Sequence, residues 1–362
     1  MRYLAAIIPT GEKSHMPTET SRLDLAAEWL EAFAKVQRTE ERLLYEHLAR
    51  GLANDEETLE LAVTDRGQPP TILLAAVHYL LLKGTEHPLC EFYPNLISTP
   101  ASPDNAYDAF RSFCAKYREP LRLLVDSRIV QTNEVGRCAY LCLVFGMISE
   151  SAGKRPLSII DVGASAGLHL LWDKYTYRYR DTARYGDPSS PVGIQSEFVG
   201  TGRPRFPSGI PEVVYRHGID IRPLDVKNED DALWLRALVW AEDRARAATV
   251  ERAMAVAREF PVQLSEGTGV DLVSSVIKQT PDNSIVCVFH TSTLYQWTED
   301  EREKFHTTLS AASKSVDLRL ISSEGIAPGK CELTLTSWKK GKPELRKLAQ
   351  VAPHGQWIEW IE

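Results

Sequence analysis

Residues 157–170 read Leu157-Ser158-Ile159-Ile160-Asp161-Val162-Gly163-Ala164-Ser165-Ala166-Gly167-Leu168-His169-Leu170. The apolar beginning predicts a buried strand, and the small residues that follow are typical of a tight turn into a helix. Such a turn lets a ligand come close to the backbone, and it can present N–H groups at a helix N-terminus. We therefore expect a ligand to bind above this turn.

Two known motifs fit the turn, and they imply different chemistry. Asp161-x-Gly163-x-x-x-Gly167 resembles motif I of class I S-adenosylmethionine (SAM) methyltransferases, where the turn packs against the methionine end of the cofactor. Gly163-x-Ser165-x-Gly167 also fits the nucleophile elbow of α/β-hydrolases, in which a strained turn presents a serine. In a third interpretation the small residues serve packing alone.

Composition excludes several classes of protein. The 362 residues can form two domains, and 43% hydrophobic residues can bury a substantial core. The net charge of −7 argues against a nucleic-acid binder, which needs a cationic surface for phosphates. The longest apolar run, Thr71–Leu82, is too short to span a bilayer, so we expect a cytoplasmic protein with no membrane partner.

Cysteine spacing predicts neither a disulfide framework nor a metal site. The six cysteines contain no Cys-x-x-Cys pair and are diluted over a long chain. Cys138 and Cys142 share a helix face, but no histidine cluster completes a zinc-binding set. We expect reduced, mostly buried thiols and no metal.

The order of predicted elements divides the chain at about residue 130. Residues 1–130 contain helical patterns and no convincing strand, which predicts an all-helical N-terminal cap domain. Strands then alternate with helices over 131–362, which predicts an α/β domain with a mostly parallel sheet covered on both faces. Glu332–Trp338 and Gln356–Ile361, separated by a basic loop, are expected to form an antiparallel edge pair.

A second acid completes the expected nucleotide site. The next strong strand ends in Asp220, where a carboxylate can accept hydrogen bonds from both ribose hydroxyls. The usual offset from the glycines is about 20 residues, whereas Asp220 follows Gly167 by 53 positions. Residues 173–211 must therefore be an insertion. Asp187 and Glu197 are competing acids, although neither ends a comparable strand.

Polar residues also open the helix that precedes the central strand. The helix start contains more polar side chains than a cap needs, among them Asn133, Glu134 and Arg137. One interpretation is a cap with a surface pair between Glu134 and Arg137. The other is a polar cluster that faces the site above Gly163.

Several ordered blocks together resemble a widespread microbial family known only as a conserved domain of unknown function. The resemblance spans roughly residues 20–361. Two positions depart from the pattern expected of the family: His169 replaces Asn, and Gly267-Thr268 replaces Gly-Asp. The second departure weakens the acidic contact to an adenine amine that is usual in a methyltransferase-like site. The blocks are Gln131-Thr132-Asn133-Glu134-Val135-Gly136-Arg137, Val162–Leu168, Gly218–Val226, Trp234–Trp240, Phe289-His290-Thr291 and His354–Trp360.

The order of elements also resembles the Rossmann-like fold of SAM methyltransferases. The resemblance implies SAM as cofactor, and it implies that the loop from His290 to Leu294 lies beside the transferable methyl group. His290 is the candidate base because its ordinary pKa of about 6.5 suits proton removal at neutral pH. The implied substrate contacts are Asn133, Glu134, Arg137 and Thr291. The implied cofactor contacts are Asp161, Gly163, Ala164, Ser165, Gly167, Asp220, Ile221, Thr268 and Phe289.

Three functions remain open at this point. The first is a SAM-dependent methyltransferase (a transferase) acting on a small molecule, which needs alignment of the reactants but no covalent nucleophile. The second is a serine hydrolase using Ser165, with His290, His306 or His354 as base and an acid such as Asp317. The third is a non-catalytic binding protein with a nucleotide-binding fold. Oligomeric state is not indicated.

Overall fold

The computed structural model describes residues 19–180, 184–339 and 341–362. Its described residues form two compact units. Unit 1 contains Asn133–Lys227 and Thr249–Glu362, and unit 2 contains the residues up to Thr132 together with Asn228–Ala248. Asn228–Ala248 therefore belongs with the N-terminal helices, although its sequence position lies well inside the predicted 131–362 domain.

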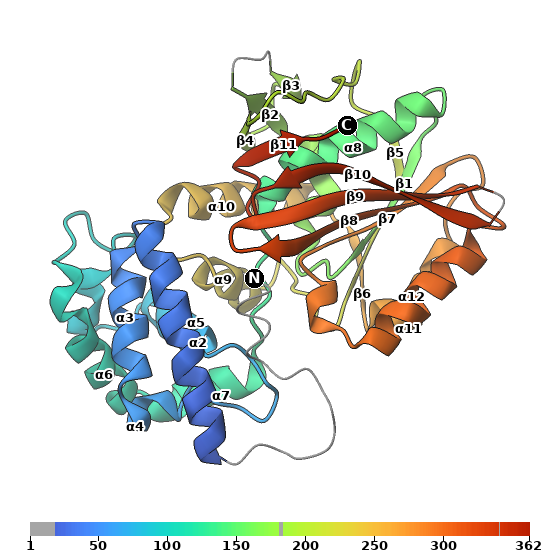
Figure 1. The fold of residues 1–362 in the computed structure, drawn as a ribbon. Helices are drawn as coiled ribbons and strands as arrows, with labels where there is room; N and C mark the ends of the chain where they lie inside the picture. The colour runs from blue at the N-terminus through green and yellow to red at the C-terminus, as the bar shows by residue number, and fades with distance from the viewer. Residues whose placement is uncertain (1–18, 181–183, 340) are drawn as a thin grey trace. The chain divides into compact units, whose positions relative to one another are not determined.

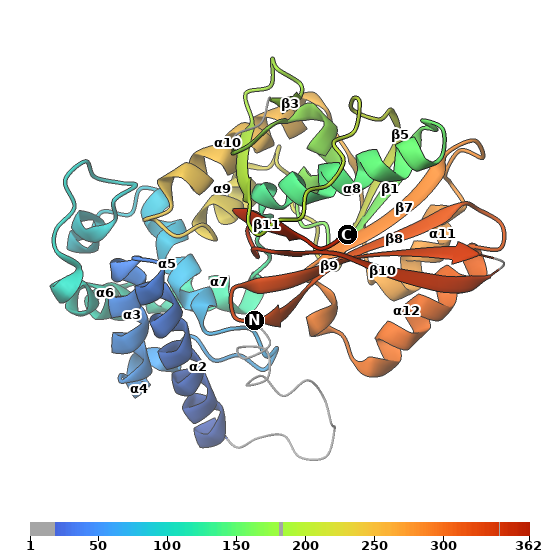
Figure 2. The same cartoon turned by 45° about the horizontal axis from the view of Figure 1, so that its top comes forward.

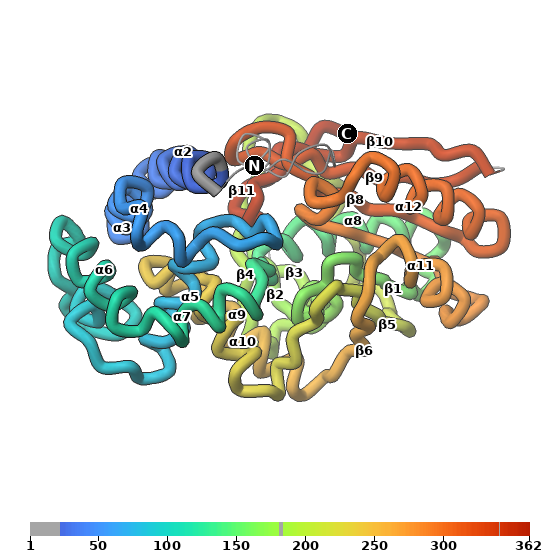
Figure 3. The backbone as a smooth tube through the Cα atoms, turned by 90° about the horizontal axis from the view of Figure 1, so that it is seen from below, coloured from blue at the N-terminus to red at the C-terminus, as the bar shows by residue number. Residues whose placement is uncertain are grey.

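Helices and loops make up the described part of unit 2 (Figures 1 and 3). His78, on a helix that is buried almost throughout, binds the Ala237 carbonyl through Nδ1 at 3.0 Å. Trp240 packs against Tyr45, with ring centroids 4.5 Å apart. These contacts fasten the late segment into the helical core. The helices are α2 (Glu19–Thr39), α3 (Leu43–Ala53), α4 (Glu56–Leu59), α5 (Thr71–Leu82), α6 (Ala106–Lys116), α7 (Arg118–Ser127) and α9 (Glu229–Ala237), with 3-10 turns η1 (Pro88–Phe92) and η2 (Pro103–Asn105) and the start of α10 (Arg244–Glu259).

Unit 1 contains a large, mostly parallel sheet in the order β3-β2-β4-β11-β10-β9-β8-β7-β1-β5-β6. Five neighbouring strands, from β6 to β8, are all parallel. The apolar run that contains Ile159 and Ile160 forms β1 and is buried throughout, as a central parallel strand requires. These strands are β6 (Gln263–Glu266), β5 (Val213–Asp220), β1 (Leu157–Val162), β7 (Ile285–Thr291) and β8 (Leu318–Ala327).

The predicted antiparallel edge pair was wrong. The supposed basic loop contains a strand, β10, which lies between the two predicted strands and pairs antiparallel with both. The sheet then continues, because β11 pairs in parallel with β4. Figure 2 shows β9 and β10 as a long twisted pair. The additional strands are β9 (Lys330–Lys339), β10 (Lys342–Val351), β11 (Trp357–Trp360), β4 (Gly193–Phe198), β2 (Thr176–Tyr179) and β3 (Tyr185–Gly186).

Residues 173–211, the predicted insertion, lie in sequence between two strands that pair with each other. They supply β2, β3 and β4 to the other end of the sheet, whereas β1 and β5 pair directly with each other. Asp161 is thereby opposite Gly218 in the parallel register, and Val162 is opposite Ile219. The carboxyl ends of β1 and β5 consequently meet at the same edge of the sheet.

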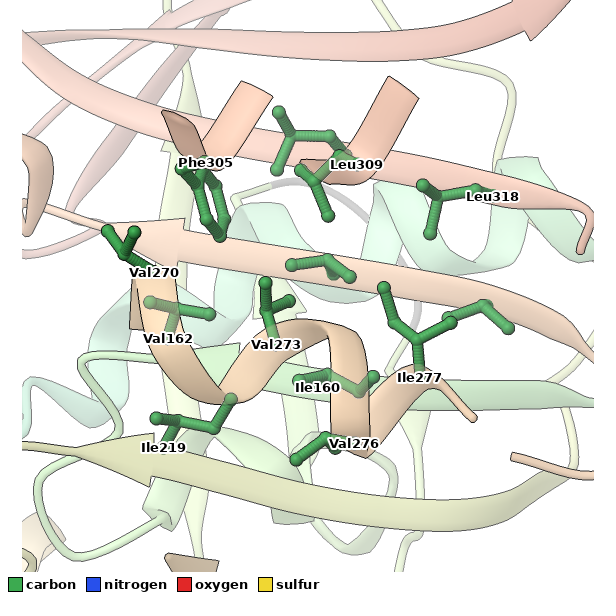
Figure 4. Packing of buried hydrophobic residues seen from close by; sticks show 13 residues of the cluster. Ile160, Val162, Ile219, Val270, Val273, Val276, Ile277, Phe305, Leu309 and Leu318 are labelled. Atoms are coloured by element: carbon green, nitrogen blue, oxygen red, sulfur yellow. The ribbon is translucent and has the colours of Figure 1, made fainter. Parts of the chain in front are cut away.

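Helices cover both faces of the parallel strands (Figure 1). Helices α11 (Gly269–Ile277) and α12 (Glu299–Ala312) pack on Ile160 and Val162 of β1, as Figure 4 shows. Helix α8 (Cys138–Ser151) lies on the other face, where Phe145 contacts Phe289 of β7 with centroids 5.4 Å apart. Full burial of one such apolar side chain contributes about 1.5–3 kcal/mol. Alternate residues of each parallel strand point to opposite faces of the sheet, and so to opposite helix layers.

Candidate functional site

The turn after β1 is tightly bonded to the protein itself. The N–H groups of Gly163 and Ala164 donate to the Ile219 carbonyl at 2.8 and 3.2 Å, and that of Gly167 donates to the Ala164 carbonyl at 2.8 Å. Short 3-10 turns, η4 (Leu168–Lys174), follow in place of the expected α-helix. These three N–H groups therefore already have acceptors within the protein, and binding of a ligand above the turn stays a prediction.

Asp220 lies where the insertion argument predicted, at the end of β5 beside the turn. Its carboxylate accepts from the Ser165 N–H at 2.8 Å and from the Arg222 N–H at 2.9 Å. Burial raises the pKa of Asp220, the two N–H donors lower it, and the charge of Asp161 raises it further. A carboxylate offers about four acceptor positions. Two therefore remain, and the neighbouring Ile221 is 59% exposed.

Asp161 is the unusual group of the site. It is 1% exposed, and neither carboxylate oxygen has a hydrogen-bond partner among the described residues. Its nearest cationic candidate is His169, whose Nδ1 lies 3.4 Å from Oδ2. A buried carboxylate without donors costs free energy. An unsatisfied buried group needs an explanation, such as a catalytic role or a bound water or ion.

The polar residues before α8 contact the segment that follows the turn. The Asn133 side chain accepts from the Leu168 N–H at 2.9 Å, and His169 Nε2 binds the Glu134 carbonyl at 2.8 Å. The Glu134 carboxylate accepts from the Gly136 N–H at 3.3 Å. Asn133 and Glu134 are buried, so the cluster faces the turn as the second interpretation expected. Their contact with a substrate stays a prediction.

Arg137 joins three segments that are distant in sequence. Its Nη1 donates to the carbonyl and the hydroxyl of Thr291 at 2.9 and 3.1 Å, and its Nε donates to the Pro353 carbonyl at 2.9 Å. The expected surface pair with Glu134 was wrong, because the Arg137 side chain is buried. This role was not predicted from the sequence, since nothing in the spacing indicates that Arg137 meets the carbonyl groups of two distant segments.

The loop after β7 covers the turn. A Cβ atom built on Gly163, whose φ is +84°, lies 2.4 Å from Thr293 Oγ1. Ser292 and Ser165 themselves have positive φ, 54° and 52°, which is uncommon for a residue with a side chain. Strained backbone of this kind clusters at functional sites. Ser292 follows β7 directly, and Ser165 lies in the turn after β1.

Buried His290 pairs with half-buried Glu324, which was not predicted from the sequence. Nδ1 lies 2.8 Å from Glu324 Oε1, and Nε2 has no partner among the described residues. The same Oε1 accepts from the N–H groups of Thr293 and Leu294 at 3.0 Å each. Burial alone raises the pKa of Glu324, but the hydrogen bond and charge of His290 and these N–H donors hold it below its usual value.

His290 and Asp161 point to opposite faces of the sheet. The His290 ring contacts Phe305 of α12, with centroids 6.3 Å apart. Asp161 alternates with Ile160 and Val162, which face α11 and α12, so its side chain faces α8. The two groups share the carboxyl edge of the sheet but not one face.

The remaining predicted residues have structural contacts. The Phe289 ring is buried and packs in the core against Phe145. Ala164 is buried and packs against Gly218. Thr268 caps α11, because its hydroxyl accepts from the Asp271 N–H at 3.2 Å. Cofactor contacts by these three side chains stay predictions.

Asp317 does not fit a hydrolase triad with Ser165. It precedes β8 directly and pairs with Arg155 at 2.8 Å, at the amino edge of the parallel strands. Ser165 follows the carboxyl end of β1. Parallel strands place these positions at opposite edges, so Asp317 was wrong as the orienting acid.

Comparisons with known proteins identify the family. A model described as "Uncharacterized protein conserved in bacteria (DUF2332)" matches residues 27–360, so the chain belongs to this family and the resemblance from the sequence blocks is confirmed. No curated protein matches the chain. In the part of the chain that the structure describes, no group of three or more His, Cys, Asp or Glu side chains could hold a metal ion. The described helices are all too short or too polar to cross a membrane.

Proposed function

We propose that the protein is a SAM-dependent methyltransferase that acts on a small-molecule acceptor. The carrying observation is the pair of buried acids at the ends of β1 and β5, on either side of a glycine turn, with neither oxygen of Asp161 accepting a hydrogen bond from the described residues. A turn that is flanked by acids and does not bind phosphate suits a cofactor that presents an ammonium group and ribose hydroxyls, because carboxylates accept hydrogen bonds from both.

The strand order supports a nucleotide-type site at this position. The strands β6-β5-β1-β7-β8 correspond to the order 3-2-1-4-5 of the Rossmann fold, in which ligands bind where the order reverses, at the carboxyl ends of the strands. That reversal lies between β1 and β7, beside Gly163 and Thr293. Fold likeness alone does not carry the activity, which is why the proposal rests on the acids.

The residues fit the polar groups of SAM. The Asp161 carboxylate would accept hydrogen bonds from the ammonium group, and the two remaining acceptor positions of Asp220 would bind the ribose hydroxyls. Exposed Ile221 would cover one face of adenine. When bound, SAM supplies an electrophilic methyl group, and the protein's contribution is to orient the acceptor toward it.

Phosphate-bearing cofactors fit less well. The N–H groups of Gly163, Ala164, Ser165 and Gly167 all have protein acceptors. Phosphate binding at a glycine-rich turn depends on such groups being available. The proposal therefore excludes NAD and ATP as ligands of this turn.

His290 remains the proposed base for an acceptor that must lose a proton. Donation from Nδ1–H to Glu324 leaves the lone pair of neutral His290 on Nε2, where it can accept a proton. Because His290 faces α12, such an acceptor would lie over the carboxyl edge of β7.

Calorimetry with two variants tests the SAM site. Asp220→Asn keeps the shape but removes the charge, so SAM affinity should fall roughly tenfold to a hundredfold, as expected for the loss of one charge-assisted interaction of about 1.5–3 kcal/mol. Ile221→Ser should weaken binding by about 1–2 kcal/mol through lost apolar contact. Because Ile221 is exposed, its replacement should leave the fold intact. Unchanged affinity in both variants contradicts the proposed site.

One observation favours the alternative of a serine hydrolase. Ser165 has a φ of 52°, and strained backbone at the nucleophile is a property of the elbow. A fluorophosphonate probe separates the two functions. We expect Ser165 to remain unlabelled, whereas stoichiometric labelling that is lost in Ser165→Ala would establish the hydrolase. SAM binding without transfer to any acceptor would favour the non-catalytic alternative.

A further inference from the structure

The imidazole of His169 lies between a carbonyl and a carboxylate. Nε2 is 2.8 Å from the Glu134 carbonyl oxygen, which can only accept a hydrogen bond, so Nε2 must carry a hydrogen. Nδ1 is 3.4 Å from Asp161 Oδ2. The protonation state of this second contact decides the charge of the site.

The contact between Nδ1 and Asp161 needs a proton. His169 and Asp161 are 2% and 1% exposed, and neither Nδ1 nor the two carboxylate oxygens have another hydrogen-bond partner among the described residues. A neutral ring would direct the lone pair of Nδ1 toward a carboxylate that also offers only lone pairs. Two buried acceptors facing each other are unfavourable.

The surrounding charges favour placing that proton on the ring. Asp220 of β5 faces Asp161 closely enough to raise its own pKa. Glu134 before α8 and Asp173 of η4 both act, with Asp161, on the buried thiol of Cys138. Of the nearby cations, Arg216 is bound bidentately to Asp173, and Arg137 donates to Thr291 and Pro353. An acidic surrounding stabilises an imidazolium.

We propose that His169 is an imidazolium that neutralises Asp161 in the ligand-free protein, and that the ammonium group of a bound ligand takes over this pairing and releases the His169 proton to solvent. The second half rests on the proposed SAM function. His169 is then the residue that makes ligand affinity depend on pH: binding releases a proton and becomes tighter as pH rises.

The first test is nitrogen NMR of the ligand-free protein at pH 7. We expect both ring nitrogens of His169, assigned by their loss in His169→Asn, to show the shifts of a protonated ring. In Asp161→Asn the ring should become neutral, because the carboxylate that holds the proton is gone. A neutral ring protonated only at Nε2 in the wild type would overturn the proposal.

The second test is calorimetry of SAM binding at pH 7 in two buffers of different ionisation enthalpy. We expect release of about one proton per SAM bound by the wild type and no release by His169→Asn. S-adenosylhomocysteine, which keeps the ammonium but lacks the sulfonium charge, should release the same amount. Binding without proton release would overturn the displacement. No SAM binding by the wild type would instead contradict the proposed function, and the NMR result would still decide the state of His169.

Discussion

At the scale of single residues, Gly136 and Gly355 join the segments around residues 136 and 355 through direct backbone contact. A Cβ built on Gly136 lies 2.2 Å from the His354 carbonyl oxygen, and one built on Gly355 lies 2.1 Å from the Gly136 carbonyl oxygen. Backbone cannot move aside as a flexible side chain can. The contact fixes the segment from which Arg137 reaches Pro353 and Asn133 reaches Leu168 at the end of the turn.

Gly136→Ala should therefore destabilise the protein. Overpacking of this kind costs about 1–3 kcal/mol, measurable as a lower urea midpoint with unchanged slope. Gly209→Ala is the matched control, because no atom lies within 4 Å of its built Cβ. Equal midpoints for the two variants would contradict a backbone contact between the blocks.

Glu324 predicts a pH dependence of stability. Its folded-state pKa lies below the ordinary value of 4.5, so its carboxylate stabilises the fold above that value, and this stabilisation is lost as pH falls through the folded-state pKa. The difference in unfolding free energy between wild type and Glu324→Gln should thus be large at pH 6 and shrink below pH 4. A difference that is constant over this range would show that Glu324 is not ionised in the folded protein.

Asp220 could be predicted from the sequence, whereas Glu324 and the contact between His169 and Asp161 could not. Asp220 was predictable because an acid at a strand end next to a glycine turn has a local pattern, even with an insertion between them. Glu324 and the pairing of His169 with Asp161 have no such pattern. They depend on which side chains face each other across neighbouring strands and turns, and only the register of the sheet determines that.

At the scale of elements, α12 begins with a complete capping box. The Thr298 hydroxyl accepts from the Glu301 N–H at 3.3 Å, and the Glu301 carboxylate accepts from the Thr298 N–H at 2.8 Å. Thr298→Ala should cost about 1 kcal/mol of stability. Thr308→Ala, in the same helix, should be neutral, because its hydroxyl binds only the Lys304 carbonyl four residues earlier. Equal losses in thermal unfolding would contradict the role of the cap.

Buried elements were predictable, whereas β10 was not. The strands at Leu157 and Ile285 are apolar because helices cover both faces. The first six residues of β10, from Lys342 to Lys347, are exposed, so no alternation of apolar and polar side chains marks the strand. The predicted edge pair failed there because β10 is held by backbone pairing with β9 and β11.

At the scale of the whole molecule, unit 2 depends on the late segment Asn228–Ala248. Trp240 packs on Phe33 and Tyr45, and the backbone N–H groups of Leu44 and Tyr45 donate to Glu242. The sequence predicted the helical character of residues 19–127 from local periodicity. It could not predict which core receives a segment that arrives a hundred residues later.

A fragment of residues 1–132 should therefore not fold cooperatively. Without the late segment, Tyr45 and Phe33 lose aromatic partners, and His78 loses its carbonyl partner. Thermal unfolding followed by circular dichroism should show no sharp transition, whereas the same fragment joined to residues 228–248 by a flexible linker should recover one. A cooperative transition in the shorter fragment would establish the N-terminal region as an independent domain.

Titration calorimetry of the wild-type protein with SAM, S-adenosylhomocysteine, ATP and NAD tests the central claim most directly. Asp161 accepts no hydrogen bond from the described residues, Asp220 has acceptor positions beyond its two N–H donors, and the N–H groups of Gly163, Ala164, Ser165 and Gly167 already have protein acceptors. These features predict saturable binding of the first two ligands and none of the phosphate-bearing pair. Absence of binding by both SAM and S-adenosylhomocysteine, or preferential binding of ATP or NAD, would contradict a SAM site at the carboxyl edge of β1 and β5.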